Sequence, residues 1–283
     1  MQQWLMDHKI PLGSWIKQGV EALKQAQWFF DGVSTVLKFF IEGLTALLLW
    51  PPAEVMLVAI CALAWWLHRS ILLTLFIAAA LALIINLGFW KPTMQTLSLV
   101  TWSTIVCMSV GVPFGIAAAH RPWLFNAVRP VLDLMQTLPT FVYLIPTLIL
   151  FGLGVVPGLI STVIFALPAP IRLTQLGVSS VPKHLLEAGE AFGATKRQLL
   201  WKVELPYALP SIMAGVTQCI MLSLSMVVIA ALVGADGLGK PVVRALNTVN
   251  VSMGFEAGLA IVVLAILLDR VCKWPERRLK GSR

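Results

Sequence analysis

Residues Gly234 to Lys240 spell GxxxxGK, the spacing of a loop that wraps a nucleotide phosphate in its backbone amides. That chemistry also needs a Ser or Thr after the lysine to hold magnesium, and Pro241 stands there instead. The stretch follows an apolar run rather than a short strand. We therefore predict an external turn here and no ATP hydrolysis by this chain alone.

The other residues able to do chemistry form no catalytic or metal-binding set. Four histidines lack HxxxH or HExxH spacing: His8, His68, His120 and His184. Four cysteines lack CxxC spacing and are interpreted as small apolar residues in a membrane: Cys61, Cys107, Cys219 and Cys272. Asp133 is predicted to be a solvated residue near a span end, whereas Arg172 is either a topology anchor or a functional residue.

The composition is that of a membrane protein, because 58% of the 283 residues are hydrophobic and only 12% are charged. Soluble domains have about a quarter of their residues charged. Seven apolar runs are predicted to be helical spans, and they cover residues 54–67, 70–89, 94–118, 138–153, 158–176, 208–233 and 256–272. The first run is the weakest candidate, since a span takes about 20 residues. The N-terminal residues do not have the pattern of a cleavable signal peptide.

The distribution of charge indicates an orientation. With the C-terminus in the cytoplasm, fourteen of the 21 Lys and Arg residues fall on the inner side and three in outer loops. The net charge of +8 is therefore a topology signal rather than a nucleic-acid footprint. This orientation places residues 182–206 and the basic tail 273–283 inside, and the loop 234–239 outside.

Residues 1–53 form a segment of different character. Apolar side chains recur at helical spacing between Val33 and Leu48, opposite polar ones, before Pro51 and Pro52 stop the helix. We interpret this segment as an amphipathic helix lying on the membrane, with an eighth span as the alternative.

Five prolines lie within or at the ends of the predicted spans: Pro113, Pro139, Pro146, Pro168 and Pro170. Each removes a backbone donor and kinks its helix. The pattern is typical of a pathway that opens and closes, although static bundles are also kinked. Two small-residue pairs, Gly111 with Gly115 and Gly254 with Gly258, predict close helix packing.

Residues 182–206 are too polar to cross a bilayer and too patterned for a slack linker. Ser179 or Ser180 is predicted to cap a first helix, which Gly193 interrupts. Thr195 and Gln198 form a capping box that starts a second helix, and this helix should end before the proline at position 206.

The first of these helices has the features of a docking element. Leu185, Gly189 and Phe192 are expected to share one face. The small residues would let a partner's backbone approach, and Phe192 would act as an anchor in a partner's groove. The alternative is a solvated loop helix.

This segment resembles the EAA motif of ABC importer permeases, EAA-x3-G-x9-I-x-LP. Glu187-Ala188-Gly189 is followed at the same spacing by Gly193 and then by Val203-Glu204-Leu205-Pro206. Gly189 replaces the second alanine and Val203 the isoleucine. Four stretches are similar to the permeases of glycine betaine/L-proline importers and their choline-importing relatives: 135–146, 164–174, 189–206 and 224–239. The resemblance covers about residues 90–272.

The resemblance implies an all-α polytopic bundle with about seven spans: a type I importer permease (MetI-like) core over 90–272, preceded by additional spans in 54–89. It implies an ATPase-docking coupling helix whose residues are Glu187, Ala188, Gly189, Glu190, Ala191, Phe192, Gly193 and Ala194. Leu205 and Pro206 would fix the turn back into the membrane. A loop facing an external substrate-binding protein would contain Gly234, Asp236, Gly237 and Gly239.

The implied function is that of an inner-membrane permease subunit for glycine betaine, proline betaine or choline. The implied partners are an ATP-binding subunit, a substrate-binding protein, a second permease copy and lipid, with no nucleic acid. ATP and Mg would be bound by the ATPase, so no cofactor or metal is expected in this chain. The quaternary-ammonium cage would lie on the binding protein, so no substrate residue is assigned. The alternative is a self-sufficient secondary transporter or channel.

Overall fold

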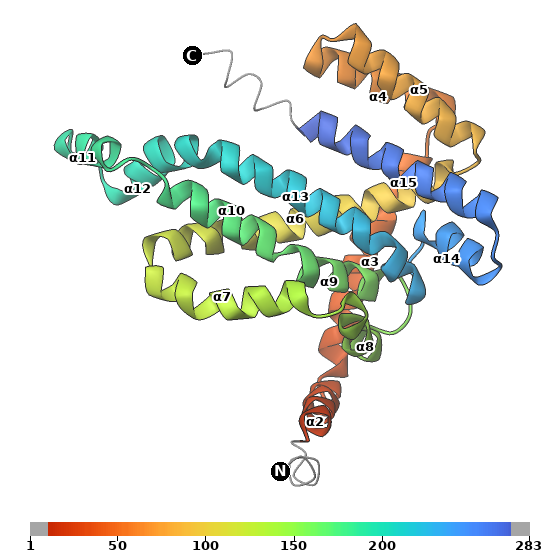
Figure 1. The fold of residues 1–283 in the computed structure, drawn as a ribbon, viewed down its shortest axis with the longest axis horizontal. Coiled ribbons are helices and arrows are strands. Elements are labelled where there is room, and N and C mark those ends of the chain that lie inside the picture. The colour runs from red at the N-terminus through yellow and green to blue at the C-terminus, as the bar shows by residue number, and fades with distance from the viewer. Residues whose placement is uncertain (1–10, 273–283) are drawn as a thin grey trace, which may run out of the picture.

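The computed structural model describes residues 11–272, and these residues form helices and no strand (Figure 1). His8 and the basic tail lie outside the described residues. The helices are α2 (Leu12–Lys24), α3 (Gln27–Leu49), α4 (Ala53–His68), α5 (Ile71–Asn86), α6 (Trp90–His120), α7 (Pro122–Thr137), α8 (Thr140–Phe151), α9 (Val155–Ala166), α10 (Pro168–Ser179), α11 (Lys183–Ala191), α12 (Lys196–Leu199), the π-helix η1 (Leu200–Glu204), α13 (Leu205–Leu232), α14 (Gly239–Asn247) and α15 (Val251–Cys272).

Five of the described helical segments are long and apolar enough to cross a membrane: α3, α6, α9 with α10, α12 through α13, and α15. A sixth is obtained if α7 and α8 are one span, although they are bent by 94°. Leu138 is extended at this bend because Pro139 follows it and disfavours helical geometry. The spans predicted at 54–67 and 70–89 correspond to α4 and α5, which have 16 residues each. Two of the seven predicted spans are therefore apolar helices that are shorter than a full-length span.

The centre of the molecule is the packing of α6 against α10 and α13. A Cβ on Gly115 would lie 2.7 Å from the carbonyl oxygen of Ile171, and one on Gly111 would lie 2.9 Å from Pro170. The close packing predicted for this pair is therefore confirmed. The second pair differs, because nothing lies within 4 Å of a Cβ on Gly258. Gly258 faces open space, so this pair is not a packing motif within the chain.

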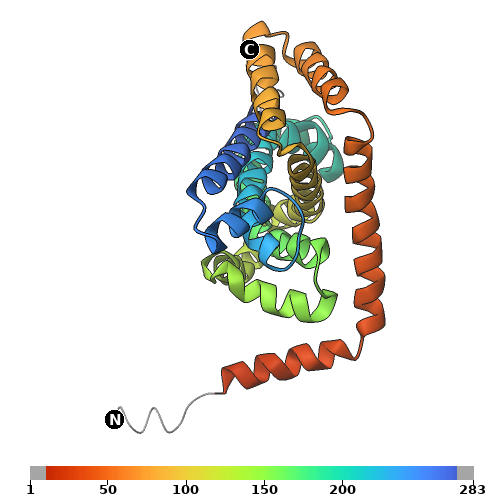
Figure 2. The ribbon, with the colours of Figure 1, turned by 90° about the vertical axis from the view of Figure 1, so that its right-hand side faces the viewer.

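The N-terminal helix α3 runs across the long helices rather than along them (Figures 1 and 2). It is attached to α6 by two hydrogen bonds to its backbone: Ser98 Oγ donates to the Ile41 oxygen at 2.7 Å, and Trp102 Nε1 donates to the Phe40 oxygen at 2.9 Å. Its length and apolarity would allow a span. Its crosswise course agrees with the interfacial helix predicted from the sequence, and its depth in a membrane stays a prediction.

Helices α4 and α5 form a hairpin at one edge of the molecule (Figure 1). Ile77 and Leu81 on α5 belong to the same buried cluster as Leu264 on α15. The hairpin is therefore attached to the bundle by apolar packing, at the side of the molecule away from α11 and α12 (Figure 1).

Candidate docking site and its links to the bundle

Helix α11 projects from one end of the bundle and ends in a Schellman motif (Figure 1). The Gly193 amide donates to the Glu190 oxygen at 2.8 Å, and the Ala194 amide donates to the Gly189 oxygen at 3.0 Å. Gly193 has a φ of 77°, which L side chains rarely adopt. The break predicted at Gly193 is thus confirmed, and its cause is the left-handed backbone.

The second helix begins as predicted. Gln198 N donates to Thr195 Oγ1 at 3.3 Å, and the Thr195 amide donates to Gln198 Oε1 at 2.8 Å. This reciprocal capping box satisfies two backbone donors at the start of α12. Local hydrogen bonds therefore define where each of the two short helices ends or begins.

The predicted end of the second helix before Pro206 is wrong. Helix α12 continues through the π-helix η1 into α13, so that residues 196–232 form one helical run. The Leu205 amide donates to the Leu200 oxygen, a shift of one residue from the α-helical pattern. Pro206 lies directly after this π-helical turn, at the start of α13, and the helical run continues past it. Leu205 and Pro206 thus continue a helix instead of making a turn.

The predicted docking residues differ in accessibility. Phe192 is 92% exposed, and Glu187, Ala188, Glu190 and Ala191 are also exposed. Gly189 instead packs against α12, because a Cβ there would lie 2.8 Å from Leu199 Cδ1. The sequence predicted that Gly189 and Phe192 share one face, and this is wrong because Gly189 contacts α12 whereas Phe192 is exposed. The absence of a side chain at Gly189 allows α11 to pack closely against Leu199 of α12.

A polar contact that the sequence did not predict ties this helix pair to the bundle. His120 Nε2 at the end of α6 lies 2.8 Å from Glu204 Oε2 in η1. The Glu204 side chain is 9% exposed and that of His120 is 47% exposed. The two residues are 84 positions apart, so no local sequence pattern predicts their contact. It joins the motif segment directly to α6.

We expect His120→Ala to lower the free energy of unfolding by about 1–3 kcal/mol, because it leaves the buried Glu204 carboxylate without its partner. Glu204→Gln should cost less, since an amide of the same size carries no charge to bury. Denaturant unfolding of the purified chain in detergent measures both. Glu21→Gln is the matched control, because its ion pair with Lys17 is exposed on both sides. Equal stability of His120→Ala and the control would contradict the prediction.

The loop predicted to face outward lies at the opposite end of the bundle and is largely buried. The Leu238 amide donates to Thr96 Oγ1 at 2.8 Å, and Leu238 has no exposed surface. A Cβ on Gly237 would lie 2.5 Å from Thr96 Oγ1, and one on Gly239 would lie 2.2 Å from the Val227 oxygen. These glycines allow the loop to pack onto α6 and α13.

Only part of this loop is available to a partner. Gly237 and Gly239 are buried and Gly234 is half-buried, whereas Asp236 is exposed and forms an ion pair with Lys240. Of the four residues that were predicted to face a partner, Asp236 is therefore the one that is exposed. Gly239 also begins α14 directly after the loop, and a helix, α13, rather than a strand precedes the loop.

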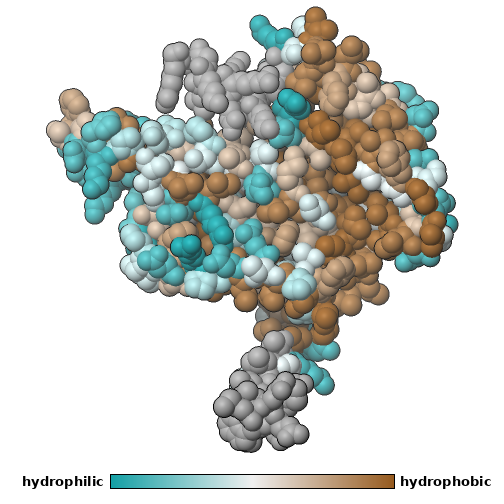
Figure 3. All heavy atoms as spheres, in the orientation of Figure 1, coloured by the Kyte–Doolittle hydropathy of each residue, from teal (hydrophilic) through white to brown (hydrophobic). Residues whose placement is uncertain are grey.

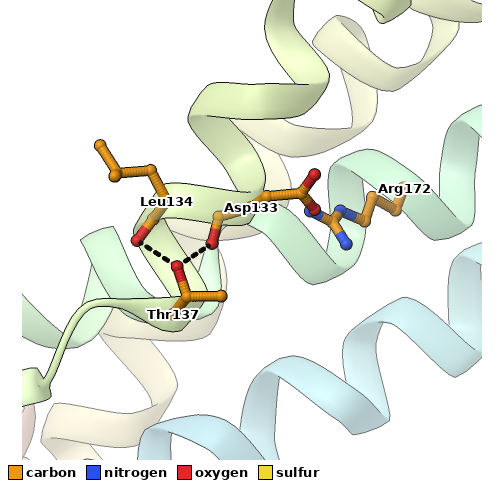
Figure 4. A network of polar contacts seen from close by, with 4 residues as sticks. All are labelled: Asp133, Leu134, Thr137 and Arg172. Atoms are coloured by element: carbon orange, nitrogen blue, oxygen red, sulfur yellow. Dashed lines mark hydrogen bonds and ion pairs between the residues drawn. The ribbon is translucent and has the colours of Figure 1, made fainter.

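Asp133 and Arg172, which the sequence placed separately near span ends, meet between α7 and α10 (Figure 4). Arg172 Nη2 donates to Asp133 Oδ1 at 2.6 Å. Thr137 Oγ1 donates to the backbone oxygens of Asp133 and Leu134, at 2.9 and 3.5 Å. The two helices are thus linked by an ion pair whose residues are 39 positions apart.

The amino-acid sequence of this chain is similar to those of known transport components. The family described as binding-protein-dependent transport system inner membrane component matches residues 111–281. The glycine betaine transport system permease protein OpuAB of Bacillus subtilis (strain 168) is 47% identical over 265 residues, which cover 93% of each chain. The glycine betaine/proline betaine permease protein ProW of Escherichia coli (strain K12) is 42% identical, over 97% of this chain and 78% of that protein.

The fold has a counterpart among solved structures. A chain of the MetNI methionine ABC transporter in an inward-facing conformation aligns with a TM-score of 0.56 and 23% identity. The alignment covers 66% of this chain and 92% of that chain. At this identity the similarity concerns the fold.

Proposed function

This chain belongs to the family of binding-protein-dependent transport system inner membrane components, and from that premise we propose that it imports quaternary ammonium compounds as a permease subunit. The observation that carries the proposal is 47% identity to a glycine betaine permease over 93% of both chains. The expected substrates are glycine betaine, proline betaine or choline. A self-sufficient transporter or channel is not supported, because the family works with a binding protein.

The proposed partner at α11 is an ATP-binding subunit. Phe192 and the exposed residues beside it form a small protruding surface, and the left-handed Gly193 fixes its shape. Exposed aromatic side chains are typical anchors of protein interfaces. ATP and Mg would be bound by that subunit, and this chain is proposed to bind no cofactor and to perform no hydrolysis.

The proposed orientation follows from the two ends of the bundle. Helix α11 would lie in the cytoplasm together with the C-terminus. Helix α14, which lies at the opposite end of the bundle from α11 (Figure 1), and Asp236 shortly before it would face the substrate-binding protein. A multi-pass inner-membrane protein with this orientation obeys the charge distribution of its sequence. Two copies of the chain would enclose the pathway.

The proposed coupling is mechanical. A displacement of α11 by the ATPase would reach α13 through the continuous helix from α12 and η1, and it would reach α6 through His120 and Glu204. Since α6 packs on α10 at glycines, the helices move as packed units between two arrangements. The loaded binding protein and the nucleotide state of the ATPase would each favour one arrangement.

Reconstitution with the cognate ATPase and binding protein tests this function. We expect ATP-dependent uptake of labelled glycine betaine into proteoliposomes, with no uptake when either partner is omitted. Competition with unlabelled proline betaine and choline defines the substrate range. Uptake by the permease alone would contradict the proposal and would favour a secondary transporter.

A further inference from the structure

The ion pair between Asp133 and Arg172 is exposed at a depth where charges are rare. The two side chains are 52% and 35% exposed. With a rise of 1.5 Å per residue, Arg172 lies about 10 Å inside the end of α10, and Asp133 about 16 Å inside the start of α7. Both of those helix ends lie at the cytoplasmic end of the proposed topology. In that topology the pair would lie within the roughly 30 Å hydrocarbon layer.

Charged side chains at this depth face the protein interior or a water-filled cavity rather than lipid. In Figure 3 the surface over α7 and the adjoining part of α10 is largely teal and pale, whereas the surface around α5 and α15 is largely brown. Gln136 and Gln175 add polar side chains on the same two helices, and both are half-buried. The ion pair and the two glutamines thus form a polar patch between α7 and α10, beside the exposed Val131, Leu134 and Leu176. Such a patch is unfavourable in hydrocarbon.

The guanidinium group of Arg172 also has unused binding capacity. Its contact with Asp133 is made through Nη2 alone. The Nε atom is buried and has no hydrogen-bond partner among the described residues. Because the side chain is 35% exposed, its outer N–H donors are open to a second acceptor, and carboxylates are the best-matched acceptors of a guanidinium group.

We infer that Arg172 and Asp133 line the translocation pathway and recognise a zwitterion. This inference rests on the proposed function. The ligand's carboxylate binds Arg172 and its quaternary ammonium lies beside Asp133, so that the ligand replaces the ion pair without leaving either charge unpaired. The pair closes again when the ligand leaves. A cation that lacks a carboxylate cannot make this exchange, so the site favours betaines over choline.

The test uses the assembled complex in proteoliposomes and measures uptake and ATPase activity in parallel. We expect Arg172→Gln to lower glycine betaine uptake at least tenfold, while the ATPase activity stimulated by the loaded binding protein remains. The double variant Arg172→Gln with Asp133→Asn should stay equally low. Lys17→Gln is the control, since its ion pair with Glu21 is exposed on α2.

The double variant separates recognition from a structural role. If the pair only fastens α7 to α10, the harmful change is the unpaired charge, and neutralising both residues restores uptake. Recovery in the double variant, or wild-type uptake by Arg172→Gln, would therefore overturn the inference. If Arg172→Gln does not assemble, Arg172→Lys carries the test. It keeps the charge without the planar fork, and we expect its uptake of glycine betaine to fall more than that of choline.

Uptake by the wild-type complex distinguishes a failure of the proposed function from a failure of the inference about Arg172 and Asp133. If it takes up no quaternary ammonium compound, the proposed function fails, and the inference fails with it. If it takes up glycine betaine and the variants behave as wild type, the proposed function stands and only the recognition by Arg172 and Asp133 is wrong.

Discussion

Phe192→Ala is expected to weaken binding of the ATPase subunit at least tenfold without changing the stability of the chain. The ring is 92% exposed, so its removal leaves the fold unaltered. Truncation of an interface anchor costs about 2 kcal/mol or more, and each 1.4 kcal/mol is a factor of ten in affinity. Co-purification and a titration of the ATPase against the reconstituted permease measure the effect. ATP-dependent uptake should fall in parallel.

The control for this variant is Phe39→Ala. Phe39 is also an exposed phenylalanine, at 73%, but it lies on α3. Its truncation is expected to leave ATPase binding unchanged. Normal ATPase binding by Phe192→Ala would show that α11 is not the docking helix, whereas equal losses in both variants would point to a general effect of removing surface aromatics.

Gly239→Ala is expected to destabilise the chain by about 3 kcal/mol, at the upper end of the usual cost of overpacking. The added Cβ would lie 2.2 Å from the backbone oxygen of Val227, and a backbone atom cannot rotate away. The loop that packs on Thr96 would have to leave its position. Denaturant unfolding in detergent measures the stability, and uptake should fall because the outer surface is displaced.

Gly258→Ala is expected to have the opposite effect on the stability of the chain. Gly258 lies inside α15, and nothing is within 4 Å of a Cβ there. Alanine is favoured over glycine in a helix interior by roughly 0.5–1 kcal/mol, so this variant should be slightly more stable. A stability loss at Gly258 comparable to that at Gly239 would mean that both glycines are needed for helix contacts, and the steric explanation would be wrong.

The sequence predicted the features of this protein that depend on neighbouring residues. The capping box at Thr195, the break at Gly193 and the close approach at Gly115 are present, because caps, left-handed turns and small-residue ridges are encoded within a few positions. The apolar runs likewise gave a helical bundle. The motif spacing in 187–206 indicated the family to which the comparisons assign the chain.

The tertiary structure decided how distant residues combine. Leu238 meets Thr96 across 142 positions and turns a predicted surface loop into a buried one. The π-helix carries the chain past Pro206 without a turn. The pairs of His120 with Glu204 and of Asp133 with Arg172 also depend on how α6, α7 and α10 are placed. Such contacts arise when helices pack, and their partners have no fixed spacing along the chain, so a pattern of local residues does not specify them.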